Sequence, residues 1–186
     1  MAILSPGTML IADPFLKDPN FARSVILVCE HTEADGTFGF VVNNLCPVTL
    51  AEVVPNIQHP NVPLYVGGPV KYDTLHFIHQ LPGIIDGGVD LGNGMYWGGD
   101  YEKVVEYLNV GLLDLDLVKF FVGYSGWDQN QLEEEIKEGS WLATKVQDPS
   151  LLFSHDAQNI WQNALKKIED PVIQLMANFP IDPSLN

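Results

Sequence analysis

The first half of the chain alternates short apolar runs with turn-forming residues, a pattern typical of strands. Residues 7–12 (GTMLIA) form an apolar run that stops at Asp13-Pro14, and residues 23–30 (RSVILVCE) form a continuous run rich in valine and isoleucine. An uninterrupted run of this kind is typical of a strand covered on both faces. Residues 37–44 (TFGFVVNN) follow a turn cluster and are predicted to form the return strand of a hairpin.

Glycine and proline divide the centre of the chain into further short elements. Residues 63–70 (PLYVGGPV) and 73–81 (DTLHFIHQL) predict two strands around a Gly-Gly-Pro break. Residues 82–100 contain seven glycines. This density indicates short strands joined by tight turns.

Two helices are predicted from capping residues. Within residues 47–55, Thr49 and Glu52 have the spacing of a capping box, which indicates a short helix. Asp100 is expected to cap a longer helix over residues 101–110, and Gly111 to end it.

The last third of the chain predicts one strand and two more helices. Residues 116–124 (DLVKFFVGY) are expected to form the strand, and Asp128 is expected to cap the helix that follows and ends at Gly139. A final amphipathic helix is predicted to start at Ser154. Its apolar stripe consists of Ala157, Ile160, Trp161, Ala164, Leu165 and Ile168.

The order of these elements favours an α+β fold over a doubly wound parallel sheet. Strands with hairpin-like spacing come first and helices gather late, whereas a doubly wound fold alternates the two throughout. No linker-like stretch divides the chain, so residues 1–186 are predicted to form a single domain.

The strongly negative net charge limits the kinds of molecule that the protein could bind. The chain carries 24 Asp and Glu against 9 Lys and Arg, a formal net charge of −15. Direct binding of nucleic acid or of an anionic membrane surface is therefore disfavoured, and neutral or cationic partners are favoured. Cys29 and Cys46 are expected to be buried thiols, and without a signal-peptide pattern or a long apolar run the protein is expected in the cytoplasm.

Ser125 stands in the sequence Gly-Tyr-Ser-Gly-Trp, where an apolar run meets a predicted helix. A nucleophile elbow needs G-x-S-x-G, but here the second glycine is adjacent to the serine and Trp127 occupies its place. His155 is the only downstream histidine. The pattern favours a structural strand-to-helix turn, with a hydrolase using Ser125 as the alternative.

No motif for a metal or cofactor is complete. His76 and His79 are three residues apart on a predicted strand, which places them on opposite faces. No spacing typical of zinc ligands, of a dinucleotide-binding loop or of a phosphate loop is present. We expect neither a metal nor a cofactor.

Arg23 is the only arginine and lies just before a predicted strand. We expect it to form a structural ion pair with a carboxylate such as Asp13, Asp18 or Glu30. The alternative is that it recognises an anion in a cleft.

Four blocks of the sequence carry a family resemblance. Residues 6–43 (PGTMLIADPF…FGFVVN), the segments LYVGGPV and YWGGD, and residues 121–141 (FVGYSGWDQNQLEEEIKEGSW) resemble the YqgE/AlgH family of bacterial proteins, in the same order and over nearly the whole chain. The resemblance implies a compact α+β domain with a bent, mostly antiparallel sheet that forms a pseudo-barrel. It also implies a cytosolic protein without an established enzymatic activity, and some members have been called transcriptional regulators. Members commonly have alanine at the position of Ser125, which weakens the nucleophile hypothesis.

These observations favour a non-enzymatic regulatory or interaction protein that binds a protein or a small molecule. The alternatives are a hydrolase using Ser125 and a transcriptional regulator that acts indirectly through a protein partner. The candidate binding residues lie in or beside the blocks described above. They are Arg23, Asn43, Gly67, Gly68, Gly99, Tyr124, Trp127 and Gln131.

Overall fold

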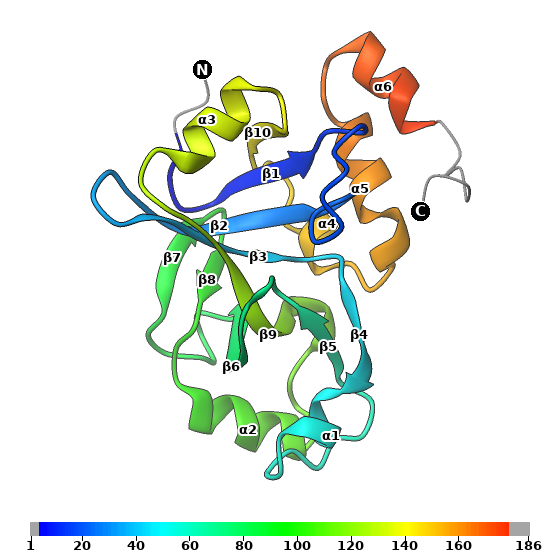
Figure 1. Cartoon of the computed structure of the whole chain (residues 1–186). Coiled ribbons are helices and arrows are strands. Elements are labelled where there is room, and N and C mark those ends of the chain that lie inside the picture. The colour runs from blue at the N-terminus through cyan, green and yellow to red at the C-terminus, as the bar shows by residue number, and fades with distance from the viewer. Residues whose placement is uncertain (1–3, 179–186) are drawn as a thin grey trace.

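The computed structural model describes residues 4–178, so the two ends of the predicted 1–186 domain lie outside the described residues. Its centre is a curled sheet with the strand order β10-β1-β2-β3-β9-β6-β8-β7, in which β5 joins β9 and β4 joins β5 (Figure 1). The strands are β1 (Thr8–Ala12), β2 (Val25–Thr32), β3 (Gly36–Val41), β4 (Leu45–Thr49), β5 (Pro63–Val66), β6 (Val70–His79), β7 (Val89–Gly92), β8 (Met95–Trp97), β9 (Val118–Trp127) and β10 (Trp141–Lys145). The pairs are antiparallel except for β5 with β9, which is parallel.

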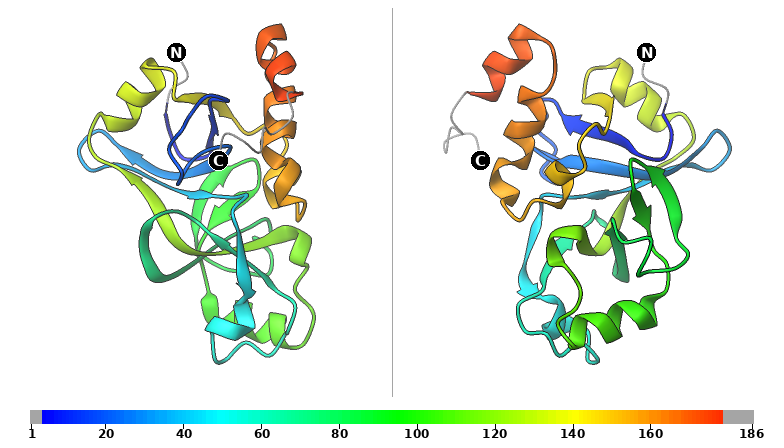
Figure 2. Two further views of the ribbon diagram at one scale, coloured as in Figure 1. Left: turned by 45° about the vertical axis from the view of Figure 1, so that its right-hand side comes forward. Right: turned by 180° about the vertical axis from the view of Figure 1, so that it is seen from behind.

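Within the described residues, six α-helices cover the two halves of this sheet. They are α1 (Leu50–Val53), α2 (Tyr101–Asn109), α3 (Gln131–Lys137), α4 (Ser150–Phe153), α5 (Ala157–Lys166) and α6 (Pro171–Ala177). In the views of Figure 2, α3 lies on one side of β1 and β2 and α5 on the other, while α1 and α2 lie at the opposite end of the molecule. The prediction of an α+β fold with a bent, mostly antiparallel sheet is confirmed.

Strand β2 shows why its sequence is apolar without interruption. Val25 and Leu27 point into a core under α4 and α5, while Ile26 and Val28 point to the opposite face, which α3 covers. Because both faces of the strand are buried, both sets of alternating side chains are apolar.

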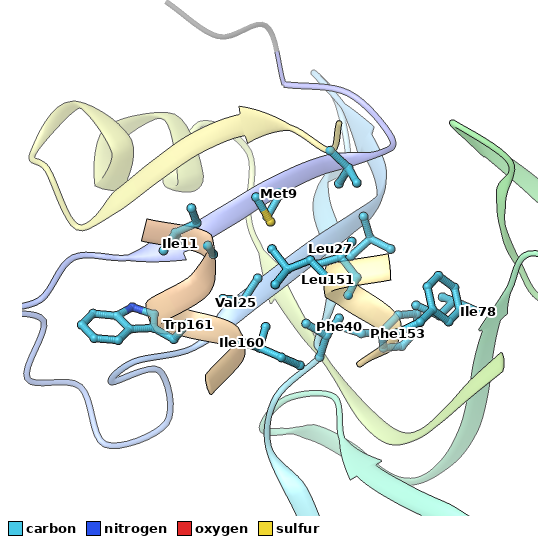
Figure 3. Close-up of a cluster of buried hydrophobic side chains, with 14 of the residues drawn as sticks. Met9, Ile11, Val25, Leu27, Phe40, Ile78, Leu151, Phe153, Ile160 and Trp161 are labelled. Atoms are coloured by element: carbon cyan, nitrogen blue, oxygen red, sulfur yellow. The ribbon is translucent and has the colours of Figure 1, made fainter. Parts of the chain in front are cut away.

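The largest core lies inside the curl of the sheet (Figure 3). Met9 and Ile11 from β1 face Ile160 and Trp161 from α5, and Phe40 from β3 extends the cluster toward the other half. A separate core under α1 and α2 is built from the outer face of β6 and β9. It includes Leu64, Phe77, Val104, Leu108 and Phe120. The amphipathic pattern of each long helix is therefore satisfied by one face of the sheet.

Three predicted boundaries in the last third of the chain are wrong. Strand β9 does not stop at Tyr124 but continues to Trp127, because Ser125 and Trp127 pair with Gly39 and Thr37 of β3. Helix α3 consequently starts later, and its N-cap is Asn130 rather than Asp128. The final amphipathic helix, α5, starts at Ala157 rather than at Ser154, and a separate short helix, α4, ends just before Ser154.

Candidate functional site

The glycines of the sequence blocks mark close approaches of the main chain. A Cβ atom on Gly67 or Gly68 would overlap the main chain of Gly123 or Tyr124, and one on Gly36 would overlap that of Trp127. The segment Gly-Tyr-Ser-Gly-Trp is thus held between two other glycine-containing segments. The structure assigns Gly67 and Gly68 to packing of β5 against β9 and brings neither to an open surface.

Ser125 is fully buried at the centre of this packing. Its hydroxyl donates a hydrogen bond to the carbonyl oxygen of Gly67 at 3.0 Å. His155, the histidine that a triad would need, instead contacts the carbonyl of Leu115 and the carboxylate of Asp116. The expected strand-to-helix turn is corrected to a buried β-strand position, and within residues 4–178 the hydroxyl is hydrogen-bonded to a main-chain carbonyl and not to a histidine.

Tyr124 points the opposite way along β9 and reaches the wall of an open hollow that we call the aromatic pocket. Its volume is about 550 Å³. The lining residues are Glu30, Asp35, Gly36, Thr37, Phe38, Val70, His76, Trp97, Tyr124, Gly126, Trp127 and Asp128. The ring of Phe38 contacts those of Trp97 and Tyr124, with centroids 4.8 and 4.7 Å apart. Three aromatic rings from three different strands therefore form one wall.

The aromatic pocket is electronegative. Its lining includes the exposed carboxylates of Glu30, Asp35 and Asp128 and contains no lysine or arginine. Burial lowers the pKa of His76 below its ordinary value of 6.5, so this side chain is neutral at pH 7. Aromatic faces beside carboxylates attract cations, because the faces of the rings carry partial negative charge.

Trp127 belongs mainly to the core under α3 rather than to the pocket. The Nε1 atoms of Trp127 and Trp141 both donate to Oε2 of Glu135, at 2.9 and 2.8 Å. Gln131 donates from Nε2 to the other carboxylate oxygen and accepts from the main-chain N–H of Asp128. These contacts give Trp127 and Gln131 a structural role beside the acidic rim of the pocket.

Arg23 and Asn43 lie together in a second pocket, the arginine pocket, with a volume of about 280 Å³. Its lining residues are Pro19, Asn20, Ala22, Arg23, Ser24, Val41, Asn43, Asn44, Ala157, Gln158, Trp161 and Gln162. The expected ion pair of Arg23 is wrong: within residues 4–178 no carboxylate lies within ion-pair distance of its guanidinium. The guanidinium lies instead over the ring of Trp161, 5.2 Å from the centroid.

The remaining candidates do not join either group. Gly99 lies at the start of α2, where an added Cβ would crowd the carbonyl of Asp86. His79 is fully buried, and its ring accepts from the N–H of Leu81 and donates to the carbonyl of Gly98. Among the described residues, no group of three or more His, Cys, Asp and Glu is arranged to hold a metal ion.

The structure also bears on the state of the two cysteines and on whether a helix could cross a membrane. Both cysteines are free thiols, but only Cys29 is buried as expected, whereas Cys46 is half-buried. In the segment from residue 4 to residue 178, no helix combines the length and the apolar character needed to cross a bilayer.

Most of the predicted binding residues therefore lie in one of two pockets or in the buried contact that the glycines make between β5 and β9. Sequence reasoning missed Phe38, His76 and Trp97 as pocket residues, because only the pairing of β3, β9, β6 and β8 brings them together. The sequence places Trp161 in an apolar stripe, but its contact with Arg23 depends on the packing of α5 against β1 and β2.

Comparisons with known proteins all point to one family of bacterial proteins. A family model described as AlgH-like matches residues 9–172. The UPF0301 protein of Chlorobaculum tepidum is 36% identical over 184 residues, covering 99% of this chain and 97% of the relative. The UPF0301 protein of Cytophaga hutchinsonii is 37% identical over 185 residues, covering 99% and 100%.

Two solved structures share the fold. The crystal structure of a protein from Corynebacterium diphtheriae matches with a TM-score of 0.74 and 26% identity, covering 96% of this chain and 94% of that one. The solution structure of the AlgH protein from Pseudomonas aeruginosa matches with a TM-score of 0.71 and 27% identity, covering 98% and 100%.

Proposed function

Since the chain belongs to the AlgH-like family, we propose that it is a non-enzymatic interaction protein whose aromatic pocket receives a lysine or arginine side chain of a protein partner. The observation that carries this proposal is the composition of the pocket. Half-buried aromatic rings meet three exposed carboxylates there, without a lysine or arginine in the lining.

The chemistry of the pocket selects this occupant. A cation over the face of a Trp, Tyr or Phe ring gains about 0.5–2 kcal/mol, depending on its desolvation. The net charge of −15 adds long-range attraction, which accelerates encounter with a positively charged partner. An exposed tyrosine, Tyr72, lies next to Gly123 on the adjoining surface and offers further contact area to a partner.

The negative net charge also affects how the protein could act in transcription. A role in transcription would act through a protein partner, because a surface with so few cations cannot neutralise several DNA phosphates. A cytoplasmic location is part of the proposal, and it is supported by two free cysteines, which are the rule in a reducing compartment.

The test compares two tripeptides, acetyl-Gly-Arg-Gly-amide and its citrulline counterpart, by calorimetry and Trp fluorescence. Citrulline has nearly the same shape as arginine but no charge. We expect the arginine peptide to bind more tightly and its binding to weaken with salt. Equal binding of the two peptides would refute a cation site.

A matched pair of triple variants separates the pocket from the overall charge. Glu30→Gln/Asp35→Asn/Asp128→Asn removes the three carboxylates of the rim, and about tenfold weaker binding is expected from three exposed charges. Glu102→Gln/Glu106→Gln/Glu169→Gln changes the net charge equally on other exposed surfaces. If both triple variants bound the arginine peptide equally weakly, the loss of affinity would come from the net charge of the protein and not from the pocket.

A further inference from the structure

The guanidinium of Arg23 has one buried nitrogen without a hydrogen-bond partner among the described residues. One face of the guanidinium lies over Trp161 at 5.2 Å. Its Nη1 atom is shielded from solvent and has no hydrogen-bond partner within residues 4–178. A buried, unsatisfied charged donor is costly, so natural proteins rarely keep one without a ligand or another use for it.

The main chain of Arg23 is held in place for this orientation. Its φ angle is +57°, a conformation that residues other than glycine seldom adopt. Asn43 clamps the segment on both sides: its Nδ2 donates to the carbonyl of Arg23 at 2.9 Å, and its Oδ1 accepts from the N–H of Val25 at 2.8 Å. Strain that is maintained by specific bonds is a recurrent feature of binding sites.

The arginine pocket lacks negative charge in a strongly acidic protein. None of its twelve lining residues is Asp or Glu, although the chain has 24 of them. The side chains of Asn20, Asn44, Gln158 and Gln162 supply amide groups instead. Ala157 and Gln158 also bring the first turn of α5, a ten-residue helix, to the pocket, and the N-cap of this helix, Asp156, is not among the lining residues.

We propose that the arginine pocket binds a small oxyanion, the carboxylate or phosphate group of a small ligand, through the guanidinium of Arg23, which lines the pocket. The planar fork of arginine matches the two oxygens of such a group, while Trp161 supports its face. A volume of about 280 Å³ suits a small molecule and not a polymer. This proposal rests on a different pocket from the proposed function and does not depend on it.

The experiment uses the fact that Arg23 is the only arginine. Its side-chain Nε–Hε group gives a single, self-assigned signal in a ¹⁵N NMR spectrum of the full chain. We would titrate inorganic phosphate and, separately, acetate at constant ionic strength, with chloride as the reference anion. A saturable shift of this signal with either oxyanion is expected, and the more effective one identifies the group. A shift that matches chloride, or no shift with both, would overturn the proposal.

A pair of identical substitutions tests the location. Asn44→Asp places a carboxylate in the pocket lining, whereas Asn163→Asp places one on an exposed part of α5 outside the lining. Both positions are exposed, so the fold is expected to persist. Asn44→Asp should weaken oxyanion binding about tenfold or more through like-charge repulsion, and Asn163→Asp should not. If both variants bind like the wild type, the arginine pocket is not the site.

Discussion

The amino group of Lys119 lies 4.2 Å from the centroid of the Tyr65 ring, inside the core of the protein. The lysine is only 1% exposed, and its Nζ donates to the carbonyls of Val42 and Ser154, each at 3.0 Å. It thereby joins the end of β3, the end of α4 and β9. Burial lowers its pKa from 10.5 to about 7.

Lys119 makes stability depend on pH in a defined direction. The unfolded chain binds this proton with a pKa near 10.5 and the folded chain with a pKa near 7, so the unfolded state holds more protons between these values. Stability should therefore rise with pH across this range, by about 2 kcal/mol from pH 7 to pH 9. Guanidinium denaturation at pH 7 and at pH 9 measures the free energy of unfolding at each pH.

The control for this prediction is Lys119→Met, which keeps the apolar stem. Burial raises the pKa of the Cys29 thiol, which acts against stability as the pH increases, and this contribution is common to both proteins. The difference between wild type and variant isolates the lysine. Equal pH dependence in the two proteins would contradict the prediction.

Gly68→Ala should destabilise the protein strongly. The new Cβ would overlap the main chain of Tyr124, which cannot move without breaking the pairing of β9. We expect a loss of about 3 kcal/mol or more, or no folding. Gly94→Ala is the comparison, since Gly94 has a φ of +75° but open space around it, and strain alone should cost about 1 kcal/mol. Similar losses in urea denaturation would show that the close approach does not matter.

Ser125→Ala should be well tolerated. The substitution removes one buried hydrogen bond, but the carbonyl of Gly67 still accepts from the N–H of Val41 at 2.8 Å. A loss of about 1 kcal/mol is expected from thermal unfolding. A fluorophosphonate probe should leave the native wild-type protein unlabelled, because the hydroxyl is buried. Labelling that Ser125→Ala abolishes would revive the hydrolase alternative.

Glu135→Leu should cost about 2–3 kcal/mol of stability. It would leave the indole N–H groups of Trp127 and Trp141 without their common acceptor. Denaturation followed by Trp fluorescence measures both the loss and any change around the two rings. Glu134→Gln, at an exposed neighbouring position, should change stability by less than about 0.5 kcal/mol. If the two variants were equally stable, the Glu135 carboxylate shared by the two indoles would not contribute to stability.

Binding of the arginine peptide should weaken as the pH falls from 7 toward about 5, where Asp and Glu remain largely ionised. His76 is neutral at pH 7 because burial lowers its pKa, and its protonation at lower pH would place a positive charge beside the ligand. His76→Phe should remove this part of the pH dependence. An unchanged profile in the variant would mean that His76 does not face the bound cation.

The sequence was informative wherever local chemistry decides the structure. Thr49 and Glu52 form the predicted capping box, Asp100 caps α2, and the continuous apolar run of residues 25–29 is the strand buried on both faces. Each of these depends on residues close in the chain. The same local patterns were sufficient for the α+β class and, through the four sequence blocks, for the family.

The candidate site was less predictable, because it depends on contacts between distant segments. Residues 125–127 remain in β9, contrary to the local turn signals, because β3 supplies pairing partners 86 to 90 residues earlier in the chain. Pairing across the sheet likewise separates Arg23 and Asn43 from Tyr124 and buries Ser125. The sequence by itself thus determined the elements and the family, since hydrophobic period, caps and turns are local. Only the tertiary structure decided which side chains share a pocket, since that follows from strand pairing and burial between residues far apart in the chain.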